Sequence, residues 1–344
     1  MWQSRGVDTW AITGGSGFLG VHLSRRLLAA GAAVRSLDVV PGDEPAVESI
    51  TGDVRNPAAA RALCRGADVL VHTAAALPIR GADIRAINVD GTATVLAAAA
   101  EAGVQRIVFI SSGVVYGLRR DPPATEETPP APVEPYGASK VEAEEVCRAF
   151  GARGLGVVVL RPQPFVGPGR LGIFGILFDW IREGRRIYTI GPGTTRYQFL
   201  AVEDLVEAIL SAAEKPVAGE TFNVGAAEFG TVAEDLQALV EHARSQSRVV
   251  PLPAPPARAL LRALDVARLS PLSAWHYRSA GRDCFIDVSK AERLLGWRPR
   301  SSNREALVAA YDWYVAGSGV EAAPGTTHRV PWNEKALGLV RRLS

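Results

Sequence analysis

Short apolar runs alternate with longer amphipathic stretches through the first half of this chain. Apolar residues dominate positions 10–12, 33–37, 47–50, 69–71, 106–110 and 157–160, and each run has the length of a buried strand. Between them, residues 21–30, a stretch beginning near 57, residues 88–102 and residues 137–150 have the spacing of amphipathic or alanine-rich helices. Strands that alternate with helices predict an α/β fold built on a Rossmann-type doubly wound parallel sheet.

The second half of the chain departs from this alternation. We expect residues 8–162 to form the sheet domain, with later segments able to return to it, and residues 163–315 to form a smaller C-terminal substrate-binding lobe. The proline-rich, apolar stretch over 251–280 predicts a lid over a site or, as the preferred interpretation, a core helix. Residues 316–344, with Trp332 and the amphipathic stretch 335–343, form an extension of unreadable function.

The turn after the first strand has the composition of a phosphate-binding turn. It reads Thr13-Gly14-Gly15-Ser16-Gly17-Phe18-Leu19-Gly20. Glycine permits positive φ and close approach of a pyrophosphate, and free amides at a helix N-terminus attract negative charge. We therefore assign Gly14, Gly17, Phe18, Leu19 and Gly20 to cofactor binding. A strand-to-helix turn without a ligand is the alternative.

Asp38 ends the second predicted strand, about 20 residues beyond the glycines. A carboxylate there can accept hydrogen bonds from both adenosine ribose hydroxyls and repels a 2′-phosphate, so it favours NAD over NADP, although Arg35 lies close in sequence. An ordinary turn residue is the alternative. Asp53, beside Val54, is placed to meet the adenine amino group or to cap the helix that begins near Pro57.

Small residues follow the fourth predicted strand at Thr73, Ala74 and Ala75, where they let a dinucleotide lie close to the backbone. His72 precedes them, but no acid or nucleophile has the spacing to activate it, so we interpret it as a packed or hydrogen-bonded core residue. Ser112 follows the fifth strand, at the carboxyl end where open α/β sheets bind their ligands.

Six segments in order along the chain resemble the extended short-chain dehydrogenase/reductase family and, within it, the NAD-dependent epimerase/dehydratase group. They read TGGSGFLG, HTAAA, NVDGT, SSGVVYG, YGASK and LRPQPFVGPG, and later echoes lie at 199–205, 222–225 and 295–299. The resemblance implies an enzyme with NAD bound by residues 8–162, and a homodimer formed through the helices around 89–102 and 137–150. It also places the catalytic hydroxyl at Ser112, with Ser111 as the fallback, and suggests that Asn88 fixes backbone and water geometry.

Tyr136 and Lys140 stand four residues apart at the start of a predicted helix. Positions i and i+4 share a helix face, so the Lys140 ammonium can lie near the phenol and reach the ribose of the cofactor. Because free tyrosine titrates at about pH 10, we expect Lys140 and the oxidised nicotinamide to stabilise the phenolate, which then takes a hydroxyl proton as hydride leaves carbon. A surface helix start with a solvated lysine is the alternative.

Several reactions share this machinery, so the substrate must be inferred from other positions. Nucleotide-sugar 4,6-dehydratases carry an Asp-Glu pair just after the active-site hydroxyl, where this chain has Gly113 and Val114, so dehydration lacks its proton carriers. Residues 112–117 resemble the sugar 4-epimerase form. The first interpretation is therefore an NAD-dependent nucleotide-sugar epimerase acting at C4. Ser112 would hold the reacting oxygen, and Arg170 or Arg196 would bind the diphosphate unless they are surface arginines.

Several departures from the sugar-nucleotide pattern favour a less polar substrate. Pro164 replaces an asparagine, residues 197–199 read Tyr-Gln-Phe in place of Arg-Asp-Phe, and Ala201 replaces an aromatic residue or histidine. The Arg161-Pro162 pair suits a branch resembling 3β-hydroxysteroid dehydrogenases, which is the alternative function. A dinucleotide-sensing module without turnover is a third reading, although such relatives typically lose the tyrosine or the lysine.

Composition agrees with a globular enzyme. The chain has 344 residues, 47% of them hydrophobic, and a net charge of +2 without a basic block, so nucleic acid is not an expected partner. Three cysteines are too few for a disulfide framework, no metal site is expected, and residues 1–10 lack a signal-peptide core. With no stretch long enough to span a bilayer, these features predict a cytoplasmic protein.

Overall fold

Seven parallel strands form one sheet in the computed structural model, which describes residues 8–76, 83–118, 121–267 and 274–318 together with Leu269, Arg329, Gly338 and Arg341. The strands are β1 (Thr9–Thr13), β2 (Ala33–Asp38), β3 (Glu48–Thr51), β4 (Val69–His72), β5 (Arg106–Ile110), β6 (Val157–Pro162) and β10 (Thr221–Val224). Their order is β10-β6-β5-β4-β1-β2-β3, so the chain reverses its direction of progress across the sheet between β1 and β4. A crevice for a ligand lies at the carboxyl ends of strands at such a switch point.

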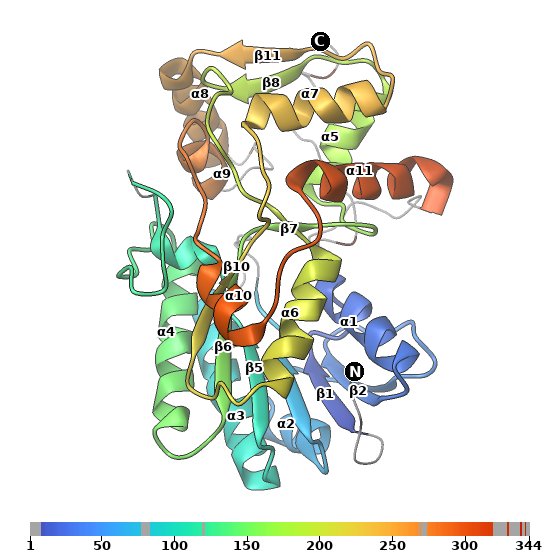
Figure 1. Ribbon diagram of the computed structural model, residues 1–344, viewed down its shortest axis with the longest axis vertical. Coiled ribbons are helices and arrows are strands. Elements are labelled where there is room, and N and C mark those ends of the chain that lie inside the picture. Colours follow the sequence, from blue (N-terminus) through green and yellow to red (C-terminus); the bar gives the residue numbers. More distant parts are fainter. Residues whose placement is uncertain are drawn as a thin grey trace.

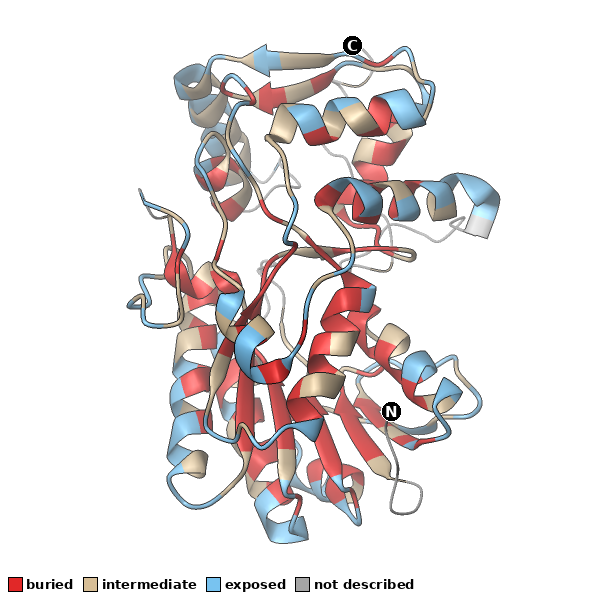
Figure 2. Ribbon diagram, viewed as in Figure 1, coloured by how far each residue is buried: buried red, intermediate tan, exposed pale blue. Residues whose placement is uncertain are grey.

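The predicted Rossmann-type fold is confirmed by this sheet and by the helices on its two faces (Figure 1). One face carries α1 (Phe18–Ala29), α6 (Val202–Glu214) and α10 (Ser289–Leu295), and the other carries α2 (Pro57–Cys64), α3 (Gly91–Ala102) and α4 (Pro135–Gly151). The central strands β4, β5 and β6 are buried almost throughout, whereas edge strand β3 is largely exposed (Figure 2). Continuous apolar runs such as residues 69–71 are what a sheet covered on both faces requires.

The smaller lobe has a hydrophobic core of its own (Figure 1). Its helices are α5 (Ile173–Arg182), α7 (Val232–His242), α8 (Ala254–Val266), α9 (Ala274–Ser279) and α11 (Asn303–Trp313), and its strands are β7 (Phe165–Val166), β8 (Ile187–Ile190), β9 (Leu200–Ala201) and β11 (Val249–Leu252). Phe178, Ile181 and Tyr311 pack at its centre. Because α6 and β10 return to the large sheet between β9 and α7, the chain crosses between the two parts more than once.

Three local predictions need correction. The first helix begins at Phe18, earlier than residue 21, because Gly17 already serves as its N-cap. Asp53 does not cap the second helix; the Asn56 side chain does, by accepting hydrogen bonds from the amides of Ala58 and Ala59. No residue of α8 is buried, so the apolar stretch after residue 251 is not a core helix.

Three short helical turns complete the described elements. A π-helical turn (Ala86–Asp90) leads into α3, a 3₁₀ turn (Gly113–Tyr116) follows β5, and a π-helical turn (Tyr314–Ser318) follows α11. Within the described ranges, no helix combines the length and apolar composition that a bilayer crossing needs. Trp332 and residues 335–337 of the C-terminal extension lie outside the described residues, but Arg329 donates to the Ser16 carbonyl oxygen at 2.9 Å.

Candidate active site

Tyr136 and Lys140 lie on consecutive turns of α4, directly beyond the carboxyl end of β5. Proline at the first helical position starts α4 at residue 135, so Tyr136 falls in its first turn. The Lys140 side chain is 2% exposed, which rules out a solvated surface lysine. Its Nζ donates a hydrogen bond to the Ile110 carbonyl oxygen at 2.9 Å and lies 6.0 Å from the centroid of the Tyr136 ring.

The electrostatics of this pair differ from the sequence-based expectation. Burial raises the pKa of Tyr136 to about 12, with Arg170 opposing the shift and Glu134 adding to it. Burial also lowers the pKa of Lys140 to about 8, against smaller effects of Cys147 and Glu144. The protein alone therefore does not make the phenol acidic. Any phenolate must draw on the positive charge that a bound oxidised nicotinamide adds to Lys140 and Arg170.

The two serines at the end of β5 have different environments. Ser111 is buried, and its hydroxyl donates to the Glu144 carboxylate, so that hydroxyl is committed to the interior. Ser112 is partly exposed and caps the following 3₁₀ turn, where its Oγ accepts a hydrogen bond from the Val114 amide at 3.3 Å. The geometry therefore leaves Ser112, and not Ser111, able to meet a substrate oxygen.

A buried ion pair supports this end of α4. The Arg161 Nε and Nη2 atoms donate to the two carboxylate oxygens of Glu144 at 2.9 Å and 2.6 Å, and Nη1 donates to the Tyr116 hydroxyl at 2.8 Å. That hydroxyl in turn donates to Asn223 Oδ1 at 2.7 Å. Desolvation alone would lower the pKa of Arg161, but the bonds to Glu144 raise it above its ordinary value. This network fixes α4 against β6 and β10.

Sequence reasoning missed Glu144, although a signal was present. Residues 136, 140 and 144 recur at a spacing of four, so Glu144 continues the helix face that carries the catalytic candidates. Its partner Arg161 lies 17 residues further along the chain, on a neighbouring strand. The fold, and not the local pattern, brings these two charges together.

Asn88 is 1% exposed and joins the loop after β4 to α4. Its Oδ1 accepts a hydrogen bond from the Ala76 amide at 2.7 Å, and its Nδ2 donates to Ser139 Oγ at 2.9 Å. Ser139 Oγ donates onward to the Tyr136 carbonyl oxygen at 2.8 Å. Asn88 thus acts on the backbone that carries Tyr136, which agrees with the positioning role that the family resemblance implies.

His72 is a buried link between the cofactor turn and Asn88. The single proton of the Thr92 hydroxyl is donated to the Asn88 carbonyl oxygen, so Thr92 Oγ1 accepts a hydrogen bond from His72 Nε2. His72 Nδ1 then accepts a hydrogen bond from the Thr13 hydroxyl. Burial lowers the pKa of His72 to about 3, with the charge of Lys140 adding to the shift. A neutral histidine with both nitrogens bonded fits the core role assigned from sequence.

The glycine-rich turn fits a dinucleotide at this end of the sheet. Gly14 has φ +72°, and a Cβ there would lie 2.8 Å from Thr73 Oγ1 and 2.9 Å from the Ala74 amide nitrogen. A Cβ at Gly20 would lie 2.3 Å from the Gly14 carbonyl oxygen, so only glycine lets α1 pack this close to the turn. The N-cap Gly17 leaves the amides of the first turn without a side-chain partner. This cradle suits a pyrophosphate.

The acids predicted to meet adenosine lie at or just beyond the carboxyl ends of β2 and β3, the two strands on one side of β1. Asp38 accepts hydrogen bonds from the Ser16 amide at 3.0 Å and the Val40 amide at 3.1 Å, which places its carboxylate beside the glycine turn. Arg35 points away from Asp38, because its Nη1 donates to the Arg65 carbonyl oxygen at 2.7 Å. Arg35 therefore does not pair with the Asp38 carboxylate. Asp53 pairs with Arg55, whose hydrogen bond lowers the pKa of Asp53.

The remaining predicted cofactor residues lie where these elements meet. Thr73 and Ala74 donate their amides to Thr13 Oγ1 at 3.1 Å and 3.2 Å, which holds the loop after β4 against the end of β1. Phe18, Leu19 and Val54 are buried, and Ala75 is partly exposed. The structure therefore brings the glycine turn, Asp38, the loop after β4 and the Tyr136-Lys140 pair to one edge of the sheet.

The two candidate arginines have different positions. Arg170 is 8% exposed and lies against the stacked rings of Phe18 and Phe165, with its guanidinium carbon 5.3 Å and 5.4 Å from their centroids. Its Nε and Nη1 have no hydrogen-bond partner. Burial lowers the pKa of Arg170 to about 9, and the nearby Tyr136 opposes this. A buried, unpartnered guanidinium beside the glycine turn fits an anionic group of a cofactor or substrate.

Arg196 belongs to the lobe. It is exposed, and its guanidinium lies against the rings of both Phe229 and Phe285, with centroids 4.6 Å and 4.9 Å away. Its backbone amide donates to Asp283 Oδ1 at 2.8 Å. The structure therefore supports Arg170 near the reacting groups and gives Arg196 aromatic partners in the lobe.

Comparisons with known proteins agree with this arrangement. Residues 10–225 match the model of the NAD dependent epimerase/dehydratase family. A 4-hydroxy-2-methyl-3-oxo-4-farnesyl-3,4-dihydroquinoline-1-oxide ketoreductase of Stigmatella aurantiaca is 31% identical over 327 residues, which cover 90% of this chain and 97% of the relative. Sterol demethylase protein B of Methylococcus capsulatus is 30% identical over 326 residues, which cover 89% of this chain and 98% of the relative.

A solved structure of the UDP-glucose 4-epimerase of Thermotoga maritima shares the fold, with a TM-score of 0.77 and 24% identity over 90% of this chain and 100% of that one. The family match covers more than half of the chain, and the two relatives extend over most of it. The chain therefore belongs to the NAD dependent epimerase/dehydratase family and is an NAD-dependent enzyme.

Proposed function

We propose that this chain is an NAD-dependent oxidoreductase that interconverts a secondary alcohol on an apolar ring system and the matching ketone, in the manner of a 3β-hydroxysteroid dehydrogenase. The observation that carries the chemistry is the buried Lys140 ammonium one turn from Tyr136, at the carboxyl end of β5. The relatives named for a ketone and a sterol support the substrate class.

The reaction consists of a proton transfer and a hydride transfer, which different groups carry out. NAD, when bound, supplies the carbon that accepts the hydride. Tyr136 takes the hydroxyl proton as the carbon–hydrogen bond breaks, so the alcohol loses two hydrogens and becomes a ketone. Ser112 holds the same oxygen, and Lys140 and Arg170 favour the anionic phenolate through their charge.

Several polar groups of the lobe are already used in internal hydrogen bonds. Gln198, which replaces the acid of the sugar-nucleotide pattern, donates from Nε2 to the Ala226 carbonyl oxygen at 2.6 Å and accepts from the Ile286 amide at 3.0 Å. The Tyr197 hydroxyl accepts from Trp275 Nε1 at 3.2 Å. These groups support the structure of the lobe and leave fewer partners for a sugar, which favours an apolar substrate.

A nucleotide-sugar 4-epimerase is the second candidate, and the sequence pattern alone places it first. The observation in its favour is Arg170, whose unpartnered nitrogens lie near Tyr136 and could bind a diphosphate. In that reaction the ketone would turn within the site, and hydride would return to its opposite face.

Two assays separate these functions. The purified chain is incubated with NAD and a 3β-hydroxysterol, and the absorbance of NADH is followed; in parallel, UDP-glucose is supplied and the products are resolved by chromatography. Net NADH with the sterol, abolished in Tyr136→Phe, supports the dehydrogenase. Formation of UDP-galactose without net NADH overturns it in favour of the epimerase. No effect of Tyr136→Phe on any substrate would favour a dinucleotide-sensing module.

We also propose a homodimer in which α3 and α4 pair with their copies, because these helices lie side by side on one face of the sheet. Sedimentation equilibrium tests this, and a monomer at every accessible concentration contradicts it.

A reducing compartment stays a prediction; Cys64, Cys147 and Cys284 are free thiols.

A further inference from the structure

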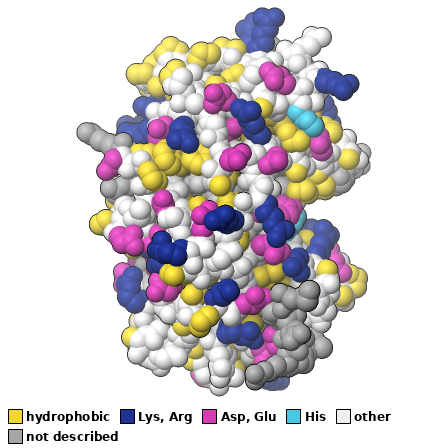
Figure 3. Space-filling model, in the orientation of Figure 1, with side chains coloured by type: hydrophobic (Ala, Val, Ile, Leu, Met, Phe, Trp, Pro, Cys, Tyr) yellow, Lys and Arg dark blue, Asp and Glu magenta, His cyan; other side chains and the backbone are white. Residues whose placement is uncertain are grey.

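The outer side of α8 is an apolar face without a partner in the described residues. Leu260 is 61% exposed, Val266 is 72% exposed, and Leu269, three residues past the end of the helix, is 52% exposed. Ala259 and Ala263 are exposed on the same side of the helix, because residues three and four apart share a face. We call these five residues the α8 face. Figure 3 shows hydrophobic side chains gathered over this end of the lobe.

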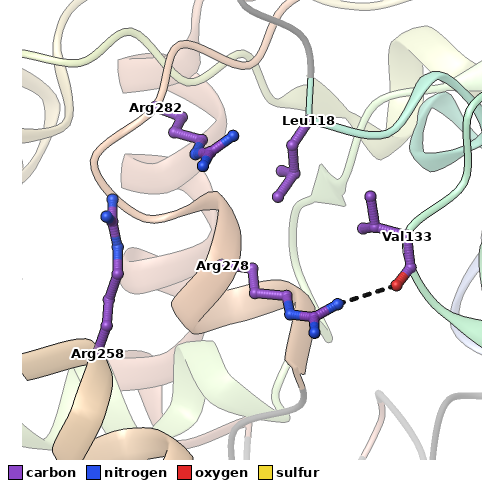
Figure 4. Close-up of a pocket in the computed structure, with 5 residues that line it drawn as sticks. All are labelled: Leu118, Val133, Arg258, Arg278 and Arg282. Carbon is purple, nitrogen blue, oxygen red and sulfur yellow. Dashed lines mark hydrogen bonds between the residues drawn. The ribbon is translucent and has the colours of Figure 1, made fainter. Parts of the chain in front are cut away.

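Arginines border the α8 face along one flank. Arg258 and Arg262 lie on α8 itself, and Arg278 and Arg282 face them from α9 and the segment after it. Two neighbouring hollows, of about 240 Å³ and 250 Å³, share Arg258 and Arg278 in their walls. Figure 4 shows the side chains of Arg258, Arg278 and Arg282 around the first hollow, with Leu118 on its other side.

The charge around these hollows is only partly compensated. Arg258 Nη2 donates to the Ala280 carbonyl oxygen at 2.6 Å and Arg278 Nη1 to the Val133 carbonyl oxygen at 3.1 Å, both neutral acceptors. Arg258 Nε is buried without a hydrogen-bond partner. Neither hollow has an acidic residue in its described lining. The nearby carboxyl groups are Asp265, which accepts from Tyr277, and Glu134, which the charge of Arg278 reaches.

We propose that the α8 face docks on an anionic phospholipid bilayer, with Leu260, Val266 and Leu269 among the acyl chains and the flanking arginines at the depth of the lipid phosphates. An apolar helix face with arginines on its border is the arrangement of helices that lie in a membrane interface. Guanidinium groups match phosphate geometry and gain from the negative surface potential.

The docking surface adjoins the loop that leads into α4, the helix that carries Tyr136 and Lys140. Arg278 bonds to Val133, which lies three residues before Tyr136. Docking would therefore bring the loop before α4 to the membrane surface. If the proposed function is correct, an apolar alcohol can pass from the bilayer to the site without crossing bulk water. The docking itself does not depend on that function, because vesicle binding and turnover are measured separately.

Co-sedimentation with vesicles tests the proposal. The full chain is mixed with vesicles of phosphatidylcholine and phosphatidylglycerol, or of phosphatidylcholine alone, and the bound fraction is measured. We expect binding to the anionic vesicles, with a partition coefficient that falls at least about tenfold in Leu260→Asp/Val266→Asp. Arg262→Ala should lower it by about fivefold on anionic vesicles only, because one arginine near the surface is lost. Leu294→Asp, at a leucine of α10 that is 42% exposed, is the matched control and should bind as the native chain does.

Three outcomes overturn the proposal: no binding of the native chain to anionic vesicles, unchanged binding of the double variant, or loss of binding in Leu294→Asp as well. Circular dichroism establishes that each variant is folded. Sedimentation velocity tests whether a second copy of the chain, and not lipid, covers the α8 face. If the native chain self-associates, the double variant does not and neither binds vesicles, the α8 face is a contact between copies and lipid docking is excluded.

Discussion

The Nδ2 atom of Asn88 donates a hydrogen bond to Ser139 Oγ at 2.9 Å, and this bond ties the loop after β4 to the first turns of α4. Ser139 passes the constraint to the Tyr136 carbonyl oxygen. On the other side, Thr92 and His72 extend the chain of hydrogen bonds to Thr13 at the glycine turn. One buried polar network thus joins the backbone that would hold the cofactor to the backbone that holds the phenol.

Removing Asn88 should slow turnover more than it weakens substrate binding. Asn88→Ala leaves the Ala76 amide without its acceptor and removes the hydrogen bond that Ser139 Oγ accepts, so the start of α4 loses a positional constraint. We expect kcat to fall by about 10- to 100-fold with a smaller change in KM, because a misplaced catalytic group affects the transition state most. Steady-state kinetics at saturating NAD check this.

A double-mutant cycle with Ser139→Ala tests the route of that effect. If Asn88 acts through Ser139, the double variant should lose little more kcat than Asn88→Ala alone, because the two residues share one pathway. Fully additive losses would show that Asn88 acts elsewhere. Melting temperatures of all three variants separate loss of position from loss of fold.

His72 should make the protein less stable in acid. Its folded pKa of about 3 lies below the unfolded value of about 6.5, so the unfolded chain binds more protons between these values. The contribution of His72 is therefore complete above about pH 6.5 and is lost as the pH falls toward 3, by at most about 1.4 kcal/mol per pH unit. Urea unfolding should give a shallower acid slope for His72→Gln than for the native chain. Parallel slopes would contradict this.

The sequence was sufficient to predict those features that depend on neighbours in the chain. Gly14 has a positive φ and Gly20 lies against the Gly14 carbonyl oxygen in the same turn, and Tyr136 and Lys140 meet because four residues make about one helical turn. The order of these segments then indicates the fold. The hydrogen bonds of His72 and the accessible position of Ser112 follow from the strand ends where the pattern placed them.

Other features depend on what the fold brings from far away. The Glu144–Arg161 pair forms only when β6 lies beside α4, and the pKa of Tyr136 depends on burial that no local pattern reports. The amphipathic pattern after residue 251 identifies an apolar helix face but does not say whether another element covers it. The structure leaves that face exposed, so the expectation of a core helix was wrong.

Lys140 should give the pH–rate profile an alkaline limb. Burial lowers its pKa to about 8, so the ammonium of the cofactor-free enzyme is lost as the pH rises through that value. Because the charge supports the phenolate and the cofactor ribose, kcat/KM for NAD should fall above about pH 8. Lys140→Arg should keep its charge and move this limb upward. An unchanged limb in Lys140→Arg would assign it to another group.

Arg170 should couple anion binding to stability. Its buried Nε and Nη1 have no hydrogen-bond partner, so Arg170→Leu should raise the melting temperature of the cofactor-free protein. The same change should raise the Kd for NAD by about tenfold or more if the guanidinium binds the pyrophosphate. Calorimetry measures both. An unchanged Kd with a raised KM for substrate would instead place Arg170 on the substrate.

Breaking the buried pair Glu144–Arg161 should lower the free energy of unfolding far more than breaking a surface pair on the same helix does. Glu144→Gln leaves Arg161 as an uncompensated charge that is 5% exposed, and we expect a loss of about 3–5 kcal/mol in the free energy of unfolding. Arg148→Ala, which removes an exposed partner of Glu145, should cost at most about 1 kcal/mol. Replacing both buried charges, as Glu144→Gln/Arg161→Met, should restore part of the loss, since no ion is then left unpaired. If Glu144→Gln and Arg148→Ala unfold at the same urea concentration, the buried pair does not hold α4 in place.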